Sequence, residues 1–165
     1  MKTLYILRHA KSSWDDANLT DFERPLNLRG ERAAPFMGKL MRASGLIPDR
    51  LISSPAIRAR QTAELVRAAA KLEAEITHDQ RIYEATAGTL IEVIGEIDEA
   101  YNATMIVGHN PGMEGLIHLL TGKIASMRTA SLAVVELDVI AWNRIERQKG
   151  RLLSLFRPKE LMPDK

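Results

Sequence analysis

The chain has 165 residues, of which 45% are hydrophobic and 27% are charged, the composition of an ordinary globular protein with enough length to bury a core. The net charge of +2 is too small to indicate nucleic-acid binding, so any strong positive potential has to be local. The absence of cysteine excludes disulfides, thiolate nucleophiles and cysteine metal sites, and the histidines lack the His-x-x-x-His spacing of a zinc site.

The beginning of the chain and its apolar runs bear on its location. The N-terminal segment lacks the long apolar region of a signal peptide, and no apolar run is long enough to cross a membrane. We therefore expect a single domain over residues 1–165, a cytoplasmic location, and neither a membrane nor a nucleic acid as partner.

The first expected element is a buried strand within Thr3–Ala10, whose apolar residues stop abruptly at Arg8 and His9. In open α/β sheets, ligands bind at the carboxyl ends of the strands, so this strand would deliver both side chains to a binding edge. The polar, turn-rich segment over residues 10–30 is long for a plain connection, which indicates a functional loop.

Helices and strands alternate along the middle of the chain. Cap residues and apolar spacing predict helices over residues 27–44, 54–71, 89–101 and 110–121. Short apolar runs between them predict strands over residues 50–53, 75–77 and 104–107. In the second and fourth helices, Ser54 and Asn110 are the expected caps, each followed by proline at the first helical position. Pro35 should kink the first helix or displace its start.

Two further strands are expected near the C-terminus, over residues 131–138 and 152–157, paired as an antiparallel hairpin at one edge of the sheet. Residues 158–165 are expected to fray. The alternation of strands and helices before this hairpin predicts an α/β fold in which three layers, α/β/α, surround a mostly parallel sheet with an antiparallel edge near the C-terminus.

Three strand-to-helix junctions, if they lie at the same edge of this sheet, would bring cationic and nucleophilic side chains together. The first junction carries Arg8 and His9, the second Arg58, and the third His109. The second and third also supply helix N-termini, whose free amides and dipole favour anions. Arginine binds phosphate oxygens through its planar fork, and histidine near neutral pH serves as nucleophile, proton carrier or donor. The four side chains have the composition of a phosphate pocket.

The motifs that carry these residues, LRHAKSSW, SSPAIRARQTA and VGHNPG, resemble those of the histidine phosphatase superfamily, with its phosphoglycerate-mutase-like fold. The small size and the pattern RHAKSSW…ERPLNLRG…VGHNPGME most resemble the SixA-type phosphohistidine phosphatases, from Thr3 to about Pro158. Ala10 stands where the best-known motif has glycine. Because alanine favours negative φ, we expect an ordinary turn after His9 and unchanged chemistry.

The resemblance implies a metal-independent phosphatase that needs no cofactor and acts in signal transduction. His9 would be the nucleophile that is transiently phosphorylated, while Arg8, Arg58 and His109 would hold the phosphate and stabilise charge on the transferring phosphoryl group. The implied partner is a phosphorylated protein, such as a histidine phosphotransfer domain, because the chain has little room for a lid over small metabolites. The alternatives are a broad-specificity phosphomonoesterase for small phosphoesters and a non-catalytic phosphoprotein-binding module.

Four further residues are candidates for the same site. Glu84 lies roughly where many family members place a general acid for the leaving group, and the alternative is a surface glutamate. Ser12, Asn18 and Arg24 lie in the loop after the nucleophile and are candidates for substrate contact. For Asn18 a solvated position is favoured, whereas Arg24 is either a second anion contact or part of a structural ion pair.

Overall fold

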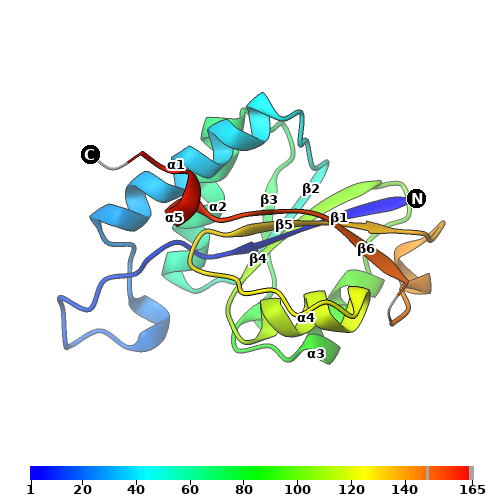
Figure 1. The fold of residues 1–165 in the computed structure, drawn as a ribbon. Coiled ribbons are helices and arrows are strands. Elements are labelled where there is room, and N and C mark those ends of the chain that lie inside the picture. The colour runs from blue at the N-terminus through cyan, green and yellow to red at the C-terminus, as the bar shows by residue number, and fades with distance from the viewer. Residues whose placement is uncertain (148, 164–165) are drawn as a thin grey trace.

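A mixed six-stranded sheet runs through the computed structural model, which describes residues 1–147 and 149–163 (Figure 1). The strands are β1 (Lys2–Arg8), β2 (Arg50–Ser53), β3 (Ile76–His78), β4 (Ala103–Gly108), β5 (Leu132–Leu137) and β6 (Gly150–Phe156). Their order is β3-β2-β4-β1-β5-β6. The first four pair in parallel, whereas β5 runs antiparallel to both β1 and β6. This arrangement confirms the predicted mostly parallel sheet with an antiparallel edge near the C-terminus.

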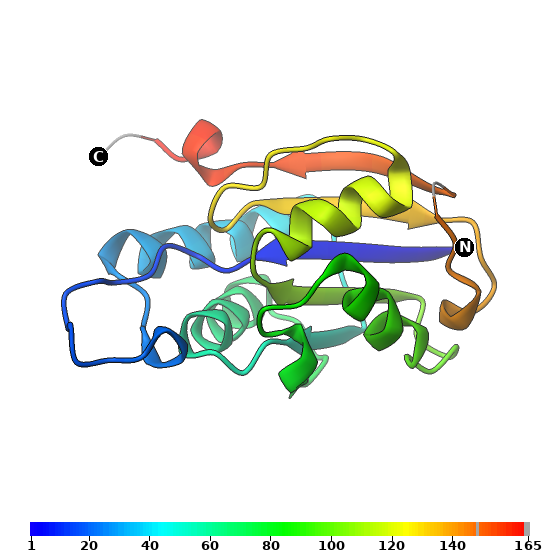
Figure 2. The same ribbon diagram turned by 90° about the horizontal axis from the view of Figure 1, so that it is seen from below.

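Helices cover both faces of the sheet. They are α1 (Leu28–Ala43), α2 (Ile57–Ala70), α3 (Ala87–Gly95), α4 (Gly112–Thr121) and α5 (Pro158–Leu161), with short 3₁₀ helices at η1 (Asp21–Glu23), η2 (Gln80–Ile82) and η3 (Trp142–Arg144). The pair α1 and α2 lies on one face with α5 beside α1, and α3 and α4 lie on the other (Figures 1 and 2). Within the described part of the chain, no helix is both long and apolar enough to span a membrane.

The alternation of side chains along β1 divides the interior into two cores. Leu4 and Ile6 belong to the core under α3 and α4, whereas Tyr5 and Leu7 belong to the core under α1 and α2. All four are buried. A strand that is apolar on both faces in this way is typical of the centre of a parallel sheet, which explains why the first apolar run is continuous rather than alternating.

The register of the central strands brings the predicted junctions to one edge. Arg8 of β1 lies opposite Gly108 of β4, and Ser53 of β2 lies opposite Val107. The three strands therefore end within one residue of the same level. The residues that follow them share the carboxyl edge of the sheet, as expected for parallel strands.

The helix starts after β2 and β4 differ from those predicted. The helix α2 begins at Ile57 rather than at Pro55, because the N–H of Ser54, the predicted cap, still donates to Val107 O (2.9 Å) and so continues the ladder with β4. Before α4, which begins at Gly112, the Asn110 side chain accepts a hydrogen bond from the Glu114 N–H (3.3 Å). Asn110 therefore contributes to the first turn, although the residue at the cap position is Pro111.

The start of α1 agrees with the prediction, whereas the end of α3 does not. The predicted cap of α1 is confirmed, since the Asn27 side chain accepts from the Gly30 N–H (2.9 Å), and Pro35 lies inside the helix without displacing its start. The helix α3 ends at Gly95 rather than near Tyr101, because Asp98 forms a competing turn in which its side chain accepts from the Ala100 N–H (2.8 Å).

The C-terminal segment was predicted wrongly as frayed. Residues 158–161 form α5, with a buried proline at its first position, and residues 164–165 lie outside the described chain. The strand β3 covers residues 76–78, one residue later than predicted.

The contact between α1 and α2 depends on a glycine. A Cβ at Gly38 would lie 2.6 Å from Val66 O and 2.7 Å from the Ala69 Cβ, so Gly38→Ala must push the two helices apart. We expect a loss of about 1–3 kcal/mol in the free energy of unfolding, measured by urea denaturation. Gly88→Ala is the matched control, because the nearest atom to its Cβ would be 3.8 Å away, and this variant should be as stable as the wild type or more stable. Equal stability of the two variants would contradict this account of the interface.

Candidate active site

His9 is fixed by its own backbone at the end of β1. Its N–H donates to Gly108 O (3.0 Å), and its carbonyl accepts from the Ala130 N–H (3.0 Å). The next residue, Ala10, is fully buried and donates its N–H to the Thr62 hydroxyl (2.9 Å). Ala10 is not among the described non-glycine residues that have positive φ, which confirms the ordinary turn predicted for alanine at this position.

The side chain of His9 is held in one tautomer. Its Nδ1 lies 2.7 Å from the carbonyl oxygen of Ala10, and because a carbonyl only accepts, Nδ1 carries the proton. The lone pair of Nε2 faces Arg58, whose Nε donates to it at 3.4 Å. Burial lowers the pKa of His9 to about 3, helped by the nearby charge of Arg58 and only partly offset by the hydrogen bond to Ala10. At neutral pH, His9 is therefore an uncharged imidazole with Nε2 available to attack.

Arg58 is oriented by Asp21, a residue that the sequence analysis did not single out. The Arg58 Nη1 donates to the Asp21 backbone carbonyl (2.6 Å), and Nη2 donates to its carboxylate (3.0 Å). The same carboxylate accepts from Arg24 Nη1 (2.9 Å) and from the Tyr83 hydroxyl (2.7 Å). Partial burial opposes ionisation of Asp21, but the hydrogen bonds from Tyr83 and Arg58 outweigh it and lower its pKa to about 2. Asp21 is therefore a permanent anion that fixes the guanidinium group.

His109 faces His9 from the end of β4. The two ring centroids lie 5.0 Å apart, and the Tyr83 ring packs edge-on against His109 at 5.4 Å. Its Nε2 is hydrogen-bonded to the Ser54 hydroxyl (2.8 Å). Burial, followed by the charge of Arg58, lowers the pKa of His109 to about 4, although the carboxylate of Asp21 opposes this shift. His109 is therefore neutral at pH 7 as well.

Two buried nitrogens at this edge lack hydrogen-bond partners among the residues that the structure describes. They are Arg8 Nε and His109 Nδ1. Arg8 is anchored at its other end, where Nη1 donates to Met127 O (2.9 Å), and burial lowers its pKa, although an arginine keeps its charge at neutral pH. Buried polar groups without partners are costly, so their presence beside Arg58 indicates a site built to bind an anion.

The predicted loop residues take different positions. Arg24 is buried, donates through Nε to Ser13 O (3.0 Å), and also hydrogen-bonds the Ser12 hydroxyl and Asp21. Of the two alternatives for Arg24, the structure therefore shows the structural ion pair. Ser12 is a hydrogen-bond partner of Arg24. Asn18 is exposed, and its N–H donates to the Asp16 side chain (2.9 Å). Ser12 and Arg24 therefore support Asp21, whereas Asn18 lies in the outer part of the loop.

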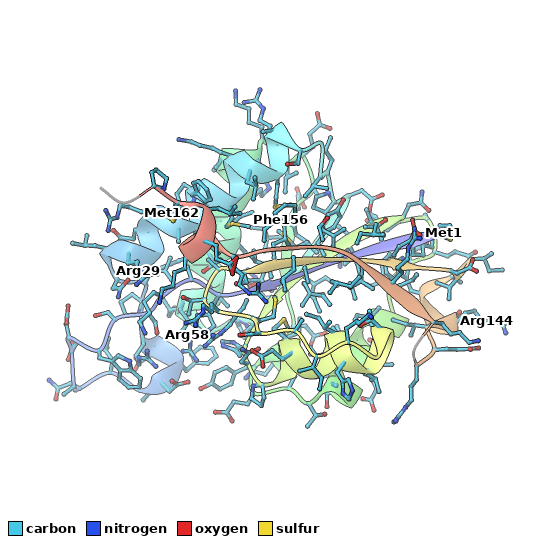
Figure 3. All side chains as sticks on the ribbon, in the orientation of Figure 1. Met1, Arg29, Arg58, Arg144, Phe156 and Met162 are labelled. Carbon is cyan, nitrogen blue, oxygen red and sulfur yellow. The ribbon has the colours of Figure 1, made fainter. Side chains whose placement is uncertain are left out.

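Glu84 lies at the mouth of a cleft of about 580 Å³ that Arg58, Tyr83 and His109 also line. The residue is exposed, and its φ of 55° is left-handed, a conformation that costs free energy in a residue other than glycine. Figure 3 shows Arg58 at the end of the sheet beside the loop that leads from β1 to α1. The cleft thus opens beside the reacting edge, with a carboxylate on its rim.

Three contributors to the site were missed in the sequence: Asp21, Tyr83 and the hydroxyl of Ser54, which was considered only as a helix cap. A signal for the first was present, because Thr20 and Glu23 form a capping box that marks a helical turn over residues 21–23. No comparable pattern marks Tyr83. Within residues 1–147 and 149–163, no group of three or more His, Asp or Glu side chains is placed to hold a metal ion.

Comparison with known sequences assigns the chain to a family. Residues 4–104 match the model of the histidine phosphatase superfamily (branch 1). An uncharacterized protein of Arabidopsis thaliana, described as chloroplastic, is 31% identical over 86% of this chain and 69% of its own length. An uncharacterized protein of Mycobacterium tuberculosis is 35% identical over 79% of this chain and 77% of its own length. The chain belongs to branch 1 of the histidine phosphatase superfamily.

Solved structures narrow the type of fold. A protein from Agrobacterium tumefaciens, described as a candidate phosphohistidine phosphatase SixA, superimposes with a TM-score of 0.83 at 29% identity and covers 95% of this chain and 98% of its own. The protein histidine phosphatase SixA complexed with tungstate gives the same TM-score of 0.83, and its 22% identity shows the fold alone. The chain is thus a phosphatase of this superfamily with the SixA type of fold, as the sequence motifs implied.

The depressed pKa values of the two histidines predict how stability depends on pH. In the unfolded chain, histidine binds a proton below about pH 6.5. In the folded protein, by contrast, the pKa is about 3 for His9 and about 4 for His109. Because the unfolded state then binds more protons, the free energy of unfolding should fall between pH 6.5 and pH 4.5, by about 2–3 kcal/mol for each histidine.

Urea denaturation at pH 7 and pH 4.5 measures this loss of stability. His9→Asn and His109→Asn should each lose less stability on acidification than the wild type does. His118→Asn, at an exposed position on α4, is the control and should lose as much as the wild type. A pH dependence that is unchanged in the first two variants would contradict the neutral-histidine site.

Proposed function

We propose that this phosphatase transfers a phosphoryl group from protein-bound phosphohistidine to Nε2 of His9 and then to water. The observation that carries the proposal is the neutral His9, whose Nε2 carries no proton and accepts a long hydrogen bond from the Nε of Arg58 (3.4 Å) in a buried, cationic surrounding. A neutral imidazole is a nucleophile, and fixed cations stabilise the charge on the equatorial oxygens during transfer.

In the first step, the Nε2 of His9 forms a bond to phosphorus while the bond from phosphorus to the substrate imidazole breaks. Arg8 and Arg58 hold the phosphoryl oxygens, and the unpartnered Nδ1 of His109 donates to one of them. His109 can do so because the Ser54 hydroxyl satisfies its other nitrogen. In the second step, water attacks phosphorus and the bond to His9 breaks, which returns its electron pair to Nε2. Both protons of the water leave with the phosphate as H₂PO₄⁻, and His9 is neutral again with its proton on Nδ1.

Asp21 has a positioning role in this scheme. It engages both terminal nitrogens of the Arg58 guanidinium and thereby leaves Nε turned toward His9. An arginine side chain has several rotatable bonds, and fixing them before substrate arrives removes an entropic cost from the reaction. The Tyr83 hydroxyl holds the opposite side of the same carboxylate.

The openness of the cleft supports a phosphohistidine carried by a protein. The segment between β3 and α3, over residues 79–86, is short and contains one 3₁₀ turn, η2. A segment of this length borders the cleft beside Glu84 without forming a lid, so a side chain on a protein surface can approach. The likeness to the Agrobacterium protein, described as a candidate phosphohistidine phosphatase, supports the same substrate class.

The substrate class is tested by comparing a phosphorylated histidine phosphotransfer domain with β-glycerophosphate, an ester whose alkoxide leaving group needs a proton, at pH 7. We expect a kcat/KM at least about a hundredfold higher for the phosphoprotein, since its P–N bond breaks without strong acid assistance. A higher kcat/KM for the ester would favour the phosphomonoesterase alternative. Binding of both compounds without turnover would favour the binding-module alternative.

The variant Glu84→Gln distinguishes an alkoxide leaving group from an imidazole leaving group. If Glu84 protonates an alkoxide leaving group, Glu84→Gln lowers kcat on an alkyl phosphate by about 10²–10⁴. The same variant should leave kcat on the phosphoprotein within about threefold of the wild type, because neutral imidazole is a good leaving group. Glu92→Gln, at a residue of α3 that does not line the cleft, is the control. An equal, large loss on both substrates would contradict the proposed substrate.

A further inference from the structure

A second hollow, of about 680 Å³, lies beside Arg8. Its lining includes six cationic side chains: Arg8, Lys11, Arg29, Arg32, Arg128 and Lys159. No carboxylate is among its described lining residues, although the chain as a whole carries a net charge of only +2. We call this hollow the basic pocket. Positive charge is therefore concentrated here rather than spread over the molecule.

The side of the basic pocket formed by α1 is built by close backbone contact. The Asn27 N–H donates to Lys11 O (3.0 Å), which ties the start of α1 to the segment after β1. Gly30 packs so tightly on the Lys11 carbonyl that any side chain there would overlap it. Arg29 and Arg32 therefore project from a helical turn that is fixed against Lys11.

The opposite side comes from the segment before β5 and from α5. Arg8 donates to Met127 O (2.9 Å), and the carbonyl of the next residue, Arg128, accepts from the Ser131 N–H (3.0 Å). The helix α5 contacts α1, and Met162 packs on the core beneath them. Figure 3 shows Met162 and Arg29 on the same side of the molecule, next to α1. Four segments distant in sequence thus enclose one volume.

Five of the six cations in this pocket are unpaired within the described part of the chain, unlike the surface cation Arg81. Elsewhere, Arg81 is paired with Asp79 (2.8 Å) and with Glu96 (2.7 Å). By contrast, the side chains of Lys11, Arg29, Arg32, Arg128 and Lys159 form no ion pair or hydrogen bond with residues 1–147 or 149–163. Like charges around one hollow repel each other, and a bound polyanion would remove that repulsion.

We propose that the basic pocket binds a compact polyphosphate group, that is, two or more linked phosphates. Arg8, which lines this pocket and lies directly before His9, connects it to the active site. Six cations match the charge of several phosphates, whereas a single phosphate is satisfied by two or three. The cations come from four segments of the chain around one volume of about 680 Å³, so a compact polyanion contacts several of them at once. Lys11 and the other pocket cations that follow it in the chain are exposed, and an acidic protein segment is the other ligand that the test distinguishes.

The test is titration calorimetry with sodium tripolyphosphate at fixed ionic strength and pH 7. We expect one molecule to bind per chain, at least about tenfold more tightly than inorganic phosphate. The double variant Arg29→Ser/Arg32→Ser should weaken this binding at least about tenfold, because it removes two charged donors. The matched control is Lys39→Ser/Arg42→Ser, which removes the same charge from exposed positions further along α1 and should bind within about twofold of the wild type.

A further variant separates the basic pocket from the active site. Arg58→Ala should retain tripolyphosphate binding within about threefold, since Arg58 does not line the pocket. Release of phosphate from tripolyphosphate, lost in His9→Ala, would identify the ligand as a substrate extension. Binding without turnover would identify a separate effector, and both results support the site.

Three results would overturn the proposal. The first is that Arg58→Ala loses tripolyphosphate binding while Arg29→Ser/Arg32→Ser retains it. The second is that the Lys39→Ser/Arg42→Ser control loses as much binding as Arg29→Ser/Arg32→Ser does. The third is that a polyglutamate peptide binds more tightly than tripolyphosphate. The last would assign the pocket to an acidic protein. The outcome is independent of the proposed function, because hydrolysis of a phosphoprotein is measured separately and neither double variant alters His9, Arg58 or His109.

Discussion

The backbone hydrogen bonds of His9 are the constraint on which the site depends. They extend the pairing of β1 by one residue on both sides, to Gly108 at the end of β4 and to Ala130 before β5. Because the central strands are in register, the same pairing brings His109 within 5.0 Å of His9, measured between ring centroids. The site therefore inherits the rigidity of the sheet, which suits a reaction that depends on placement of the phosphoryl group.

Charge around the two histidines and Arg58 is balanced by burial and by the carboxylate of Asp21. The pKa of both histidines is lowered far enough that they are neutral at pH 7, so the permanent cations of the site are arginines. Asp21 offsets part of that charge and holds Arg58, yet it leaves the Nε of Arg58 facing His9. A second carboxylate beside Arg58 would weaken anion binding. Loss of the Asp21 carboxylate, on the other hand, would leave Arg58 without its anchor.

The sequence predicted the sheet and the side chains at its edge because both depend on local pattern. The apolar run of β1 ends at Arg8 and His9 whatever the rest of the chain does. Asp21 was missed because its importance arises from contacts with Arg58 and Tyr83, which lie 37 and 62 residues away along the chain. Likewise, the C-terminal helix α5 depends on packing against α1, and no pattern in a short segment reveals such a contact. Local periodicity predicted the elements, and long-range contacts decided their ends and the support of the site.

The covalent phosphoenzyme is the most direct test of this account. The protein would be mixed with a phosphorylated histidine phosphotransfer domain, quenched within milliseconds without acid, digested, and mapped by mass spectrometry. We expect one phosphoryl group on His9, absent from His9→Ala and retained in His118→Ala. Release of phosphate by the wild type with no phosphoryl group on the enzyme, or with the group on another residue, would contradict it.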